Sequence, residues 1–254
     1  MTPSLFYSEW DQIIKDWYAN TDALACLMDN GNSLSLLHVP EPYYGDLDIC
    51  SIVIINLNPG TGLCEQCWKN QDDSSMMVNE IKNSSYSSFA KSFPMLVGKG
   101  PEPSVNWWKI RKKWIDRILE AKELETEKMP FAIELVPLHS KSFKVSDTNA
   151  YMKEMASNHQ NLDVIAAIEY AINESDAKMG IAVGKPIFEV LTGAGFNIIK
   201  DDHKPKPSTE RHYAVIGRNG RAEILCTWSS GSNSAPSKDF FDEEKELIAQ
   251  YFKP

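Results

Sequence analysis

Apolar and polar residues follow two spacings along the chain, one typical of helices and one typical of strands. Apolar side chains at helical spacing predict helices over residues 8–19, 105–122, 161–172 and 239–252. Gly184-Lys185-Pro186 predicts the start of a further helix that ends at Leu191. Continuous apolar runs rich in β-branched residues predict buried strands over residues 51–57, 131–138 and 179–183. An Asn219-Gly220 turn predicts a hairpin between residues 213–216 and 222–227. Between these elements, residues 61–104 are polar and predict a long loop.

Strands that alternate with helices indicate an α/β protein, and we expect a three-layer α/β/α sandwich around a mainly parallel sheet. The chain has 254 residues, of which 43% are hydrophobic and 24% charged, so it can form a sizeable core. We expect one domain over residues 1–254, with an N-terminal helical segment at residues 1–39 that includes a second short helix near residues 21–31.

The predicted helix at 105–122 places Trp107, Ile110, Trp114 and Ile118 on one apolar face. Basic residues surround that face between positions 109 and 113, and a second basic cluster lies between positions 204 and 221. The net charge is −9, which argues against sequence-independent coating of nucleic acid but leaves room for a local basic groove.

Membrane and cofactor signals are weak. No apolar run approaches the roughly 20 residues that cross a bilayer, and no secretory signal is visible, so we expect a cytoplasmic protein without a membrane partner. The five cysteines are scattered and predict free thiols. Cys64 and Cys67 lack a second matching pair, so we expect no metal and no cofactor.

In parallel sheets, ligands bind beyond the carboxyl ends of the strands. That rule selects residues 56–62, 134–143, 184–186 and 227–237. The first of these segments begins with Asn56-Leu57-Asn58-Pro59-Gly60. Pro59 favours an extended Asn58, and Gly60 lets backbone approach a ligand, so the Asn58 amide is expected to project into a cleft. The alternative is an ordinary Asn-Pro-Gly turn.

Residues 40–60, ending in Ile55-Asn56-Leu57-Asn58-Pro59-Gly60, resemble the uracil-DNA glycosylase superfamily. The resemblance is greatest to its mismatch-specific and thymine-type branch, whose first motif is Gly-Ile-Asn-Pro-Gly. Short segments at 134–139, 183–185 and 229–233 follow in the family's order. The resemblance implies a four-stranded parallel sheet between helices. It also implies hydrolysis of the N-glycosidic bond of a damaged or modified base in DNA, after the nucleotide is flipped out, without a cofactor.

The resemblance assigns roles to residues near the first strand. Asn58 matches the residue that positions the attacking water. Asn56 stands where the family usually has Gly, and would narrow the pocket or hydrogen-bond beside Asn58. Gly60 and Tyr44 are expected to contact the base, Tyr44 by stacking. The alternative for Tyr44 is a place in the core.

Glu134, at the end of the second strand, departs from family members that recognise uracil, which carry Asn there. An ionised Glu only accepts hydrogen bonds and suits two adjacent donors, so we expect a base other than plain uracil. The alternative is a buried ion pair with Lys141 or Lys185. His139 is a candidate base contact, general acid or phosphate contact, and the alternative is a structural hydrogen bond.

Phosphate contacts are expected from Lys185 after the third strand and from Ser229, Ser230 and Asn233 after the last. A simple Ser-rich turn is the alternative for the last three. The second family motif is altered here, and the apolar wedge that opens a duplex is missing. The expected partner is therefore DNA or a nucleotide. Two other functions remain open: a non-catalytic nucleotide or nucleic-acid binding protein, and a hydrolase of free nucleosides or nucleotides.

Overall fold

The computed structural model describes residues 2–19, 34–35, 39–57, 59, 80–81, 83–100, 102–140, 145–204, 211–229 and 238–252. Its main sheet has seven strands in the order β2-β4-β3-β6-β9-β8-β7. Their bounds are β2 (Tyr43–Tyr44), β3 (Val53–Asn56), β4 (Phe131–Glu134), β6 (Gly180–Val183), β7 (Asn197–Lys204), β8 (Arg211–Arg218) and β9 (Arg221–Ser229). A separate antiparallel pair joins β1 (Leu34–Ser35) to β5 (His139–Ser140).

The middle of the sheet is parallel. Four neighbouring strands run in the same direction, namely β4, β3, β6 and β9. Three of them are the apolar runs predicted to be buried strands, and β9 is the second strand of the predicted hairpin. The predicted α/β class is therefore confirmed, but the prediction of a four-stranded sheet is wrong. β2 adds an antiparallel edge beside β4, and β8 and β7 extend the other side as antiparallel strands.

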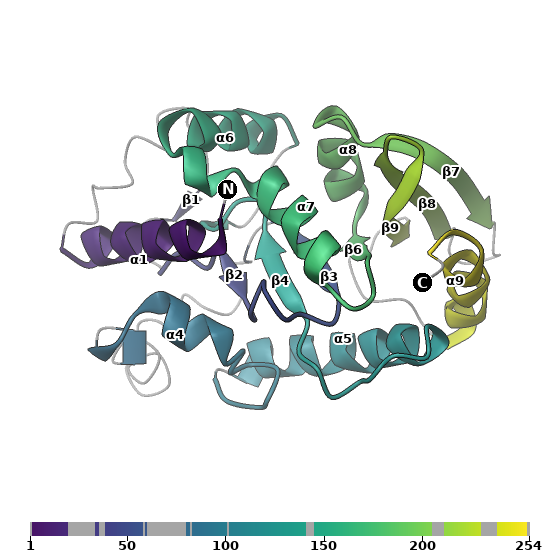
Figure 1. The fold of residues 1–254 in the computed structure, drawn as a ribbon, viewed down its shortest axis with the longest axis horizontal. Helices are drawn as coiled ribbons and strands as arrows, with labels where there is room; N and C mark the ends of the chain where they lie inside the picture. Colours follow the sequence, from purple (N-terminus) through teal and green to yellow (C-terminus); the bar gives the residue numbers. More distant parts are fainter. Residues whose placement is uncertain are drawn as a thin grey trace.

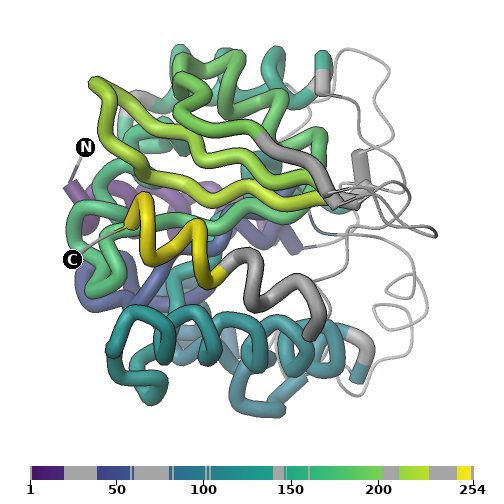
Figure 2. The backbone as a smooth tube through the Cα atoms, turned by 90° about the vertical axis from the view of Figure 1, so that its right-hand side faces the viewer, coloured from purple at the N-terminus to yellow at the C-terminus, as the bar shows by residue number. Residues whose placement is uncertain are grey.

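Helices cover both faces of the sheet (Figures 1 and 2). One face carries α6 (Val145–Asn158), α7 (Val164–Glu174) and α8 (Lys185–Gly193), and the other carries α5 (Glu102–Ala121) and α9 (Lys238–Tyr251). α1 (Pro3–Ala19) packs against α4 (Tyr86–Lys91), which contacts β2. The buried side chains of the helices and of the sheet belong to one continuous hydrophobic core. Within the described parts of the chain, no helix has the length and apolar character needed to cross a membrane.

Two helices were not predicted. α6 has a mostly polar sequence, and α4 lies inside the segment expected to be a loop. Ser85 caps α4 by accepting a hydrogen bond from the Ser88 backbone N–H, a role for which Ser is well suited. The short helix expected near residues 21–31 lies outside the described residues.

The buried face of α5 is rotated relative to the prediction. Trp114 and Ile118 are buried as expected, but Trp107 is 37% exposed and Ile110 is 60% exposed. Trp108 and Arg111 are buried in their place, with 5% and 7% of their surface exposed. A member of the predicted basic cluster thus faces the interior of the protein.

Candidate functional site

Asn56 and Glu134 form the centre of the candidate site. They end the neighbouring parallel strands β3 and β4 and are partners in the strand register. The side-chain amide of Asn56 donates a hydrogen bond from Nδ2 to Oε1 of Glu134 over 2.8 Å. The two strand ends that the sequence singled out therefore meet, as the carboxyl ends of adjacent parallel strands must.

The second carboxyl oxygen of Glu134 has a different environment. Oε2 is shielded from solvent and has no hydrogen-bond partner in the described part of the chain. Burial raises the pKa of Glu134 from its ordinary value of 4.5 to about 8. The Asn56 hydrogen bond and the charge of Arg111 favour the ionised form, and Glu41 opposes it. Desolvation is the largest effect, so Glu134 is mostly protonated at neutral pH.

A protonated carboxyl group changes the expected recognition. The hypothesis from the sequence used an ionised Glu134 that only accepts hydrogen bonds. At neutral pH the group instead offers one O–H donor together with acceptor oxygens. It therefore suits a ligand edge on which an acceptor lies beside a donor.

Glu41 lies close enough to Glu134 to raise its pKa, and it is held by two core residues. Its Oε1 is 3.0 Å from Nε2 of His139, and its Oε2 accepts a hydrogen bond from the Tyr44 hydroxyl over 2.9 Å. His139 and Tyr44 are only 1% and 2% exposed. The Tyr44 ring stacks on Phe93, with centroids 5.4 Å apart, so a base would have to displace Phe93 to stack there. Tyr44 therefore has the place in the core that was its alternative role. His139 makes a buried contact with Glu41, which fits its alternative role as a structural residue.

Arg111 supplies the positive charge of the site. Burial lowers the pKa of its guanidinium to about 9, and the nearby charge of Glu134 opposes that shift. Arg111 is therefore cationic at neutral pH. Its guanidinium lies over the ring of Trp107, and Nη1 donates to the Trp107 carbonyl oxygen over 3.5 Å.

Of the other predicted contacts, the structure describes Lys185 and the backbone of Ser229. Lys185 begins α8 and is exposed, and its Nζ lies 3.4 Å from Oε1 of Glu189, so it does not form the ion pair considered for Glu134. Ser229 ends β9, where it is paired in register with Arg211. Several other candidates lie outside the described residues, namely Asn58, Gly60, Lys141, Ser230 and Asn233.

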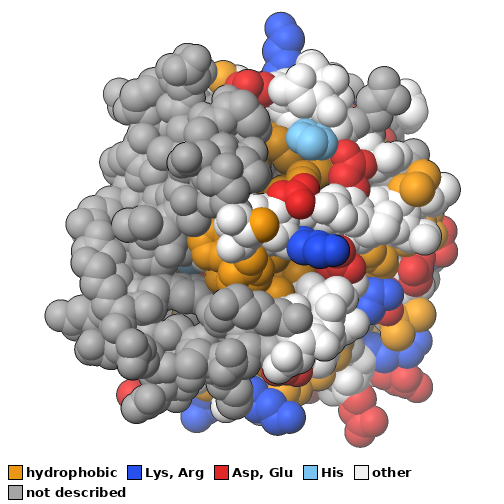
Figure 3. Space-filling model, turned by 90° about the vertical axis from the view of Figure 1, so that its left-hand side faces the viewer, with side chains coloured by type: hydrophobic (Ala, Val, Ile, Leu, Met, Phe, Trp, Pro, Cys, Tyr) orange, Lys and Arg blue, Asp and Glu red, His pale blue; other side chains and the backbone are white. Residues whose placement is uncertain are grey.

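The charge and metal predictions can be compared with the described residues. Among them, no group of three or more His, Cys, Asp or Glu side chains is placed to hold a metal ion. Cys50 and Cys226 are buried free thiols, and burial raises the pKa of both. On the coloured part of the face in Figure 3, acidic and basic side chains are interspersed and form no continuous basic stripe.

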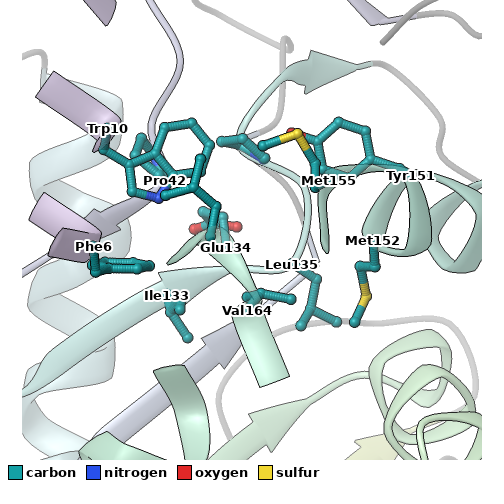
Figure 4. A pocket seen from close by; sticks show the side chains of 12 residues that line it. Phe6, Trp10, Pro42, Ile133, Glu134, Leu135, Tyr151, Met152, Met155 and Val164 are labelled. Atoms are coloured by element: carbon teal, nitrogen blue, oxygen red, sulfur yellow. The ribbon is translucent and has the colours of Figure 1, made fainter. Parts of the chain in front are cut away.

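A small cavity borders Glu134 on the side of α1 and α6 (Figure 4). Its volume is about 10 Å³, and its walls are mainly apolar and aromatic. The polar side chains that reach it belong to Glu134, Trp10 and Tyr151. Sequence reasoning missed Trp10, Glu41 and Arg111 as members of the site. Arg111 had a usable signal, because it shares the 108–111–115 helical spacing of buried residues, whereas Glu41 sits in a Pro-rich loop without one.

Comparison of the chain with protein-family models, with curated proteins and with solved structures found no match.

Proposed function

We propose that this protein is a hydrolase that cleaves the N-glycosidic bond of a damaged or modified base, with DNA as the substrate implied by the family resemblance. The observation that carries the proposal is the Asn56–Glu134 pair at the carboxyl ends of β3 and β4. In this pair the carboxyl group of Glu134 accepts a hydrogen bond from Asn56. Asn58, two residues further along the chain, matches the residue that positions water in the resembled family.

The proposed chemistry divides the work between two side chains. Asn58 aligns a water molecule whose oxygen forms a bond to the anomeric carbon. As the carbon–nitrogen bond breaks, its electron pair moves to the departing base. One proton of the attacking water is transferred to that base, so the products are the neutral base and a sugar hydroxyl. Protonated Glu134 donates a hydrogen bond to that base and stabilises the charge that develops on it. Such a reaction depends on alignment and charge stabilisation more than on a strong base.

A second candidate is a hydrolase of free nucleosides or nucleotides. The burial of Arg111 favours it, because the basic cluster of α5 loses one cation that could have contacted a DNA backbone. The net charge of −9 points the same way. In this case the site chemistry is unchanged and only the size of the substrate differs.

Base release from a panel of substrates tests the proposal. The panel contains single- and double-stranded oligonucleotides with modified bases, together with the corresponding free nucleosides. We expect the wild type to release a base from at least one class, and Asn58→Ala to lower the rate by about 100-fold or more. Lys128→Ala, which removes an exposed ion pair with Asp176 before the start of β4, is the matched control and should keep full activity.

The pH dependence of the same assay tests the role of Glu134. Because the protonated form donates to the base, the rate should fall as pH rises through about 8. Glu134→Gln keeps an N–H donor and should lose this fall at high pH. Binding of a nucleotide or oligonucleotide with no product at any pH would instead identify a non-catalytic binding protein.

A further inference from the structure

Three polar side chains border the cavity between α1, β4 and α6, and two of them, Trp10 and Glu134, carry the inference; the third is Tyr151. Trp10, on α1, is 5% exposed, and its Nε1 has no hydrogen-bond partner among the described residues. Glu134 Oε2 is shielded in the same way. Both residues line the cavity, together with apolar side chains such as Phe6, Met152 and Met155 (Figure 4). A buried polar group without a partner is costly, so a pair of them beside one cavity calls for a shared partner.

The hydrogen-bonding capacity of the two groups defines that partner. Trp10 Nε1 can only donate. Oε1 of Glu134 already accepts from Asn56, so the carboxyl proton is placed on Oε2, which then also donates. Two donors cannot satisfy each other. The partner must be an acceptor with two free lone pairs, and the cavity of about 10 Å³ has room for one water-sized oxygen.

We propose that Trp10 Nε1–H and Glu134 Oε2–H form a two-donor site for a single oxygen acceptor. A water molecule occupies it in the free protein, and a carbonyl oxygen of a ligand replaces that water on binding. The binding of a ligand carbonyl rests on the proposed function, whereas the water site does not. Two convergent donors on one oxygen would stabilise negative charge that grows on a departing oxo-base.

The proton on Oε2 depends on the charged and titratable groups that face Glu134. Arg111 on α5 favours ionisation, and Glu41 opposes it. Tyr44 on β2 and Tyr86 on α4 also lie within electrostatic range, and burial together with nearby acidic groups raises the pKa of both, so they are neutral. The apolar cavity wall and the Asn56 hydrogen bond to Oε1 leave Oε2 as the oxygen that carries the proton.

The direct test is a high-resolution crystal structure at pH 6. We expect one water within about 2.7–3.2 Å of both Trp10 Nε1 and Glu134 Oε2. Glu134→Gln keeps an N–H donor and should keep the water. Met152→Leu changes another wall of the cavity without removing a donor and should also keep it. Trp10→Phe should lose the water. A water that persists unchanged in Trp10→Phe, or that contacts neither atom in the wild type, would overturn the proposal.

A solution measurement covers the case in which Trp10→Phe does not fold. The indole N–H resonance of Trp10 should shift with pH as Glu134 ionises, because the shared oxygen must then reorient to donate to Oε2. Glu134→Gln should abolish that shift. A Trp10 resonance that does not respond to pH in the wild type contradicts the site.

Catalysis provides a separate readout of the ligand half of the proposal. On an oxo-base substrate, Trp10→Phe should lower kcat at least about tenfold with little change in KM, since the lost donor acts mainly in the transition state. An unchanged kcat in a hydrolytically active protein removes the ligand role. A wild type without any hydrolysis rejects the proposed function and leaves the water site to be judged by the first two measurements.

Discussion

At pH 9, Glu134→Gln should be more stable than the wild type by about 3–5 kcal/mol, and at pH 5 the two proteins should be nearly equal. Burial raises the pKa of Glu134 from 4.5 to about 8, and each pKa unit corresponds to about 1.4 kcal/mol. Gln is neutral at every pH and retains the acceptor that Asn56 contacts. Urea unfolding of both proteins at pH 5, 7 and 9 measures the difference.

The sign follows from proton binding. Between pH 4.5 and 8 the folded protein holds the Glu134 proton more tightly than the unfolded chain does. The contribution of Glu134 to the free energy of unfolding is therefore complete below about pH 4.5 and is lost as pH rises toward 8. Glu120→Gln, at an exposed position of α5, is the matched control and should follow the wild type. Wild-type and Glu134→Gln stabilities that stay parallel from pH 5 to 9 would show that Glu134 is not buried as a neutral acid.

Gly45→Ala should lower the free energy of unfolding by about 2–4 kcal/mol. Gly45 has φ +91°, a conformation that L side chains rarely adopt, and an added Cβ would lie 2.2 Å from the Pro130 carbonyl oxygen. This close crossing lets β2 pair with β4, whose last residue is Glu134. Thermal and urea unfolding of the variant measure the loss.

Gly195→Ala separates backbone strain from the clash. Gly195 has φ +97°, similar to Gly45, but an added Cβ there would meet no described atom within 4 Å. We expect Gly195→Ala to lower the free energy of unfolding by only about 1 kcal/mol, because it adds the backbone strain without the clash. Equal losses in the two variants would mean that the approach to Pro130 relaxes without cost.

The parallel core could be predicted from the sequence because its strands are covered on both faces and consist of unbroken β-branched runs. The hairpin was equally accessible, since Asn219 adopts φ +52° and Gly220 φ +76° in the turn, as the Asn-Gly pair predicts. The antiparallel edge at Tyr43–Tyr44 has no such signal. Two residues are too short for a periodic pattern, and only the pairing with β4 makes them a strand.

The orientation of α5 could not be settled from periodicity. Trp107 and Trp108 are adjacent, so two overlapping apolar stripes fit the same sequence. Packing against the sheet decides between them and turns Trp108 and Arg111 inward. From sequence alone, a basic side chain on the buried stripe cannot be told from a solvated one, because the groups that enclose it come from other parts of the chain.

The meeting of the first two strand ends was predictable, because parallel strands bring their carboxyl ends to one edge. The protonation of Glu134 was not. It depends on the cavity walls that α1 and α6 place beside Glu134 and on the charge of Arg111 from α5, and no local sequence pattern encodes these surroundings. The sequence therefore indicated that these strand ends meet, but it could not indicate the raised pKa of Glu134.

The central claim is that the carboxyl group of Glu134, a half-buried residue whose Oε2 is shielded from solvent, is protonated at neutral pH. Carbon-13 NMR of protein labelled at the glutamate side-chain carboxyl, with Glu134→Gln to assign the resonance, measures its titration directly. We predict a midpoint near pH 8. A midpoint between about 4 and 5, as for an exposed glutamate, would contradict the account of the site.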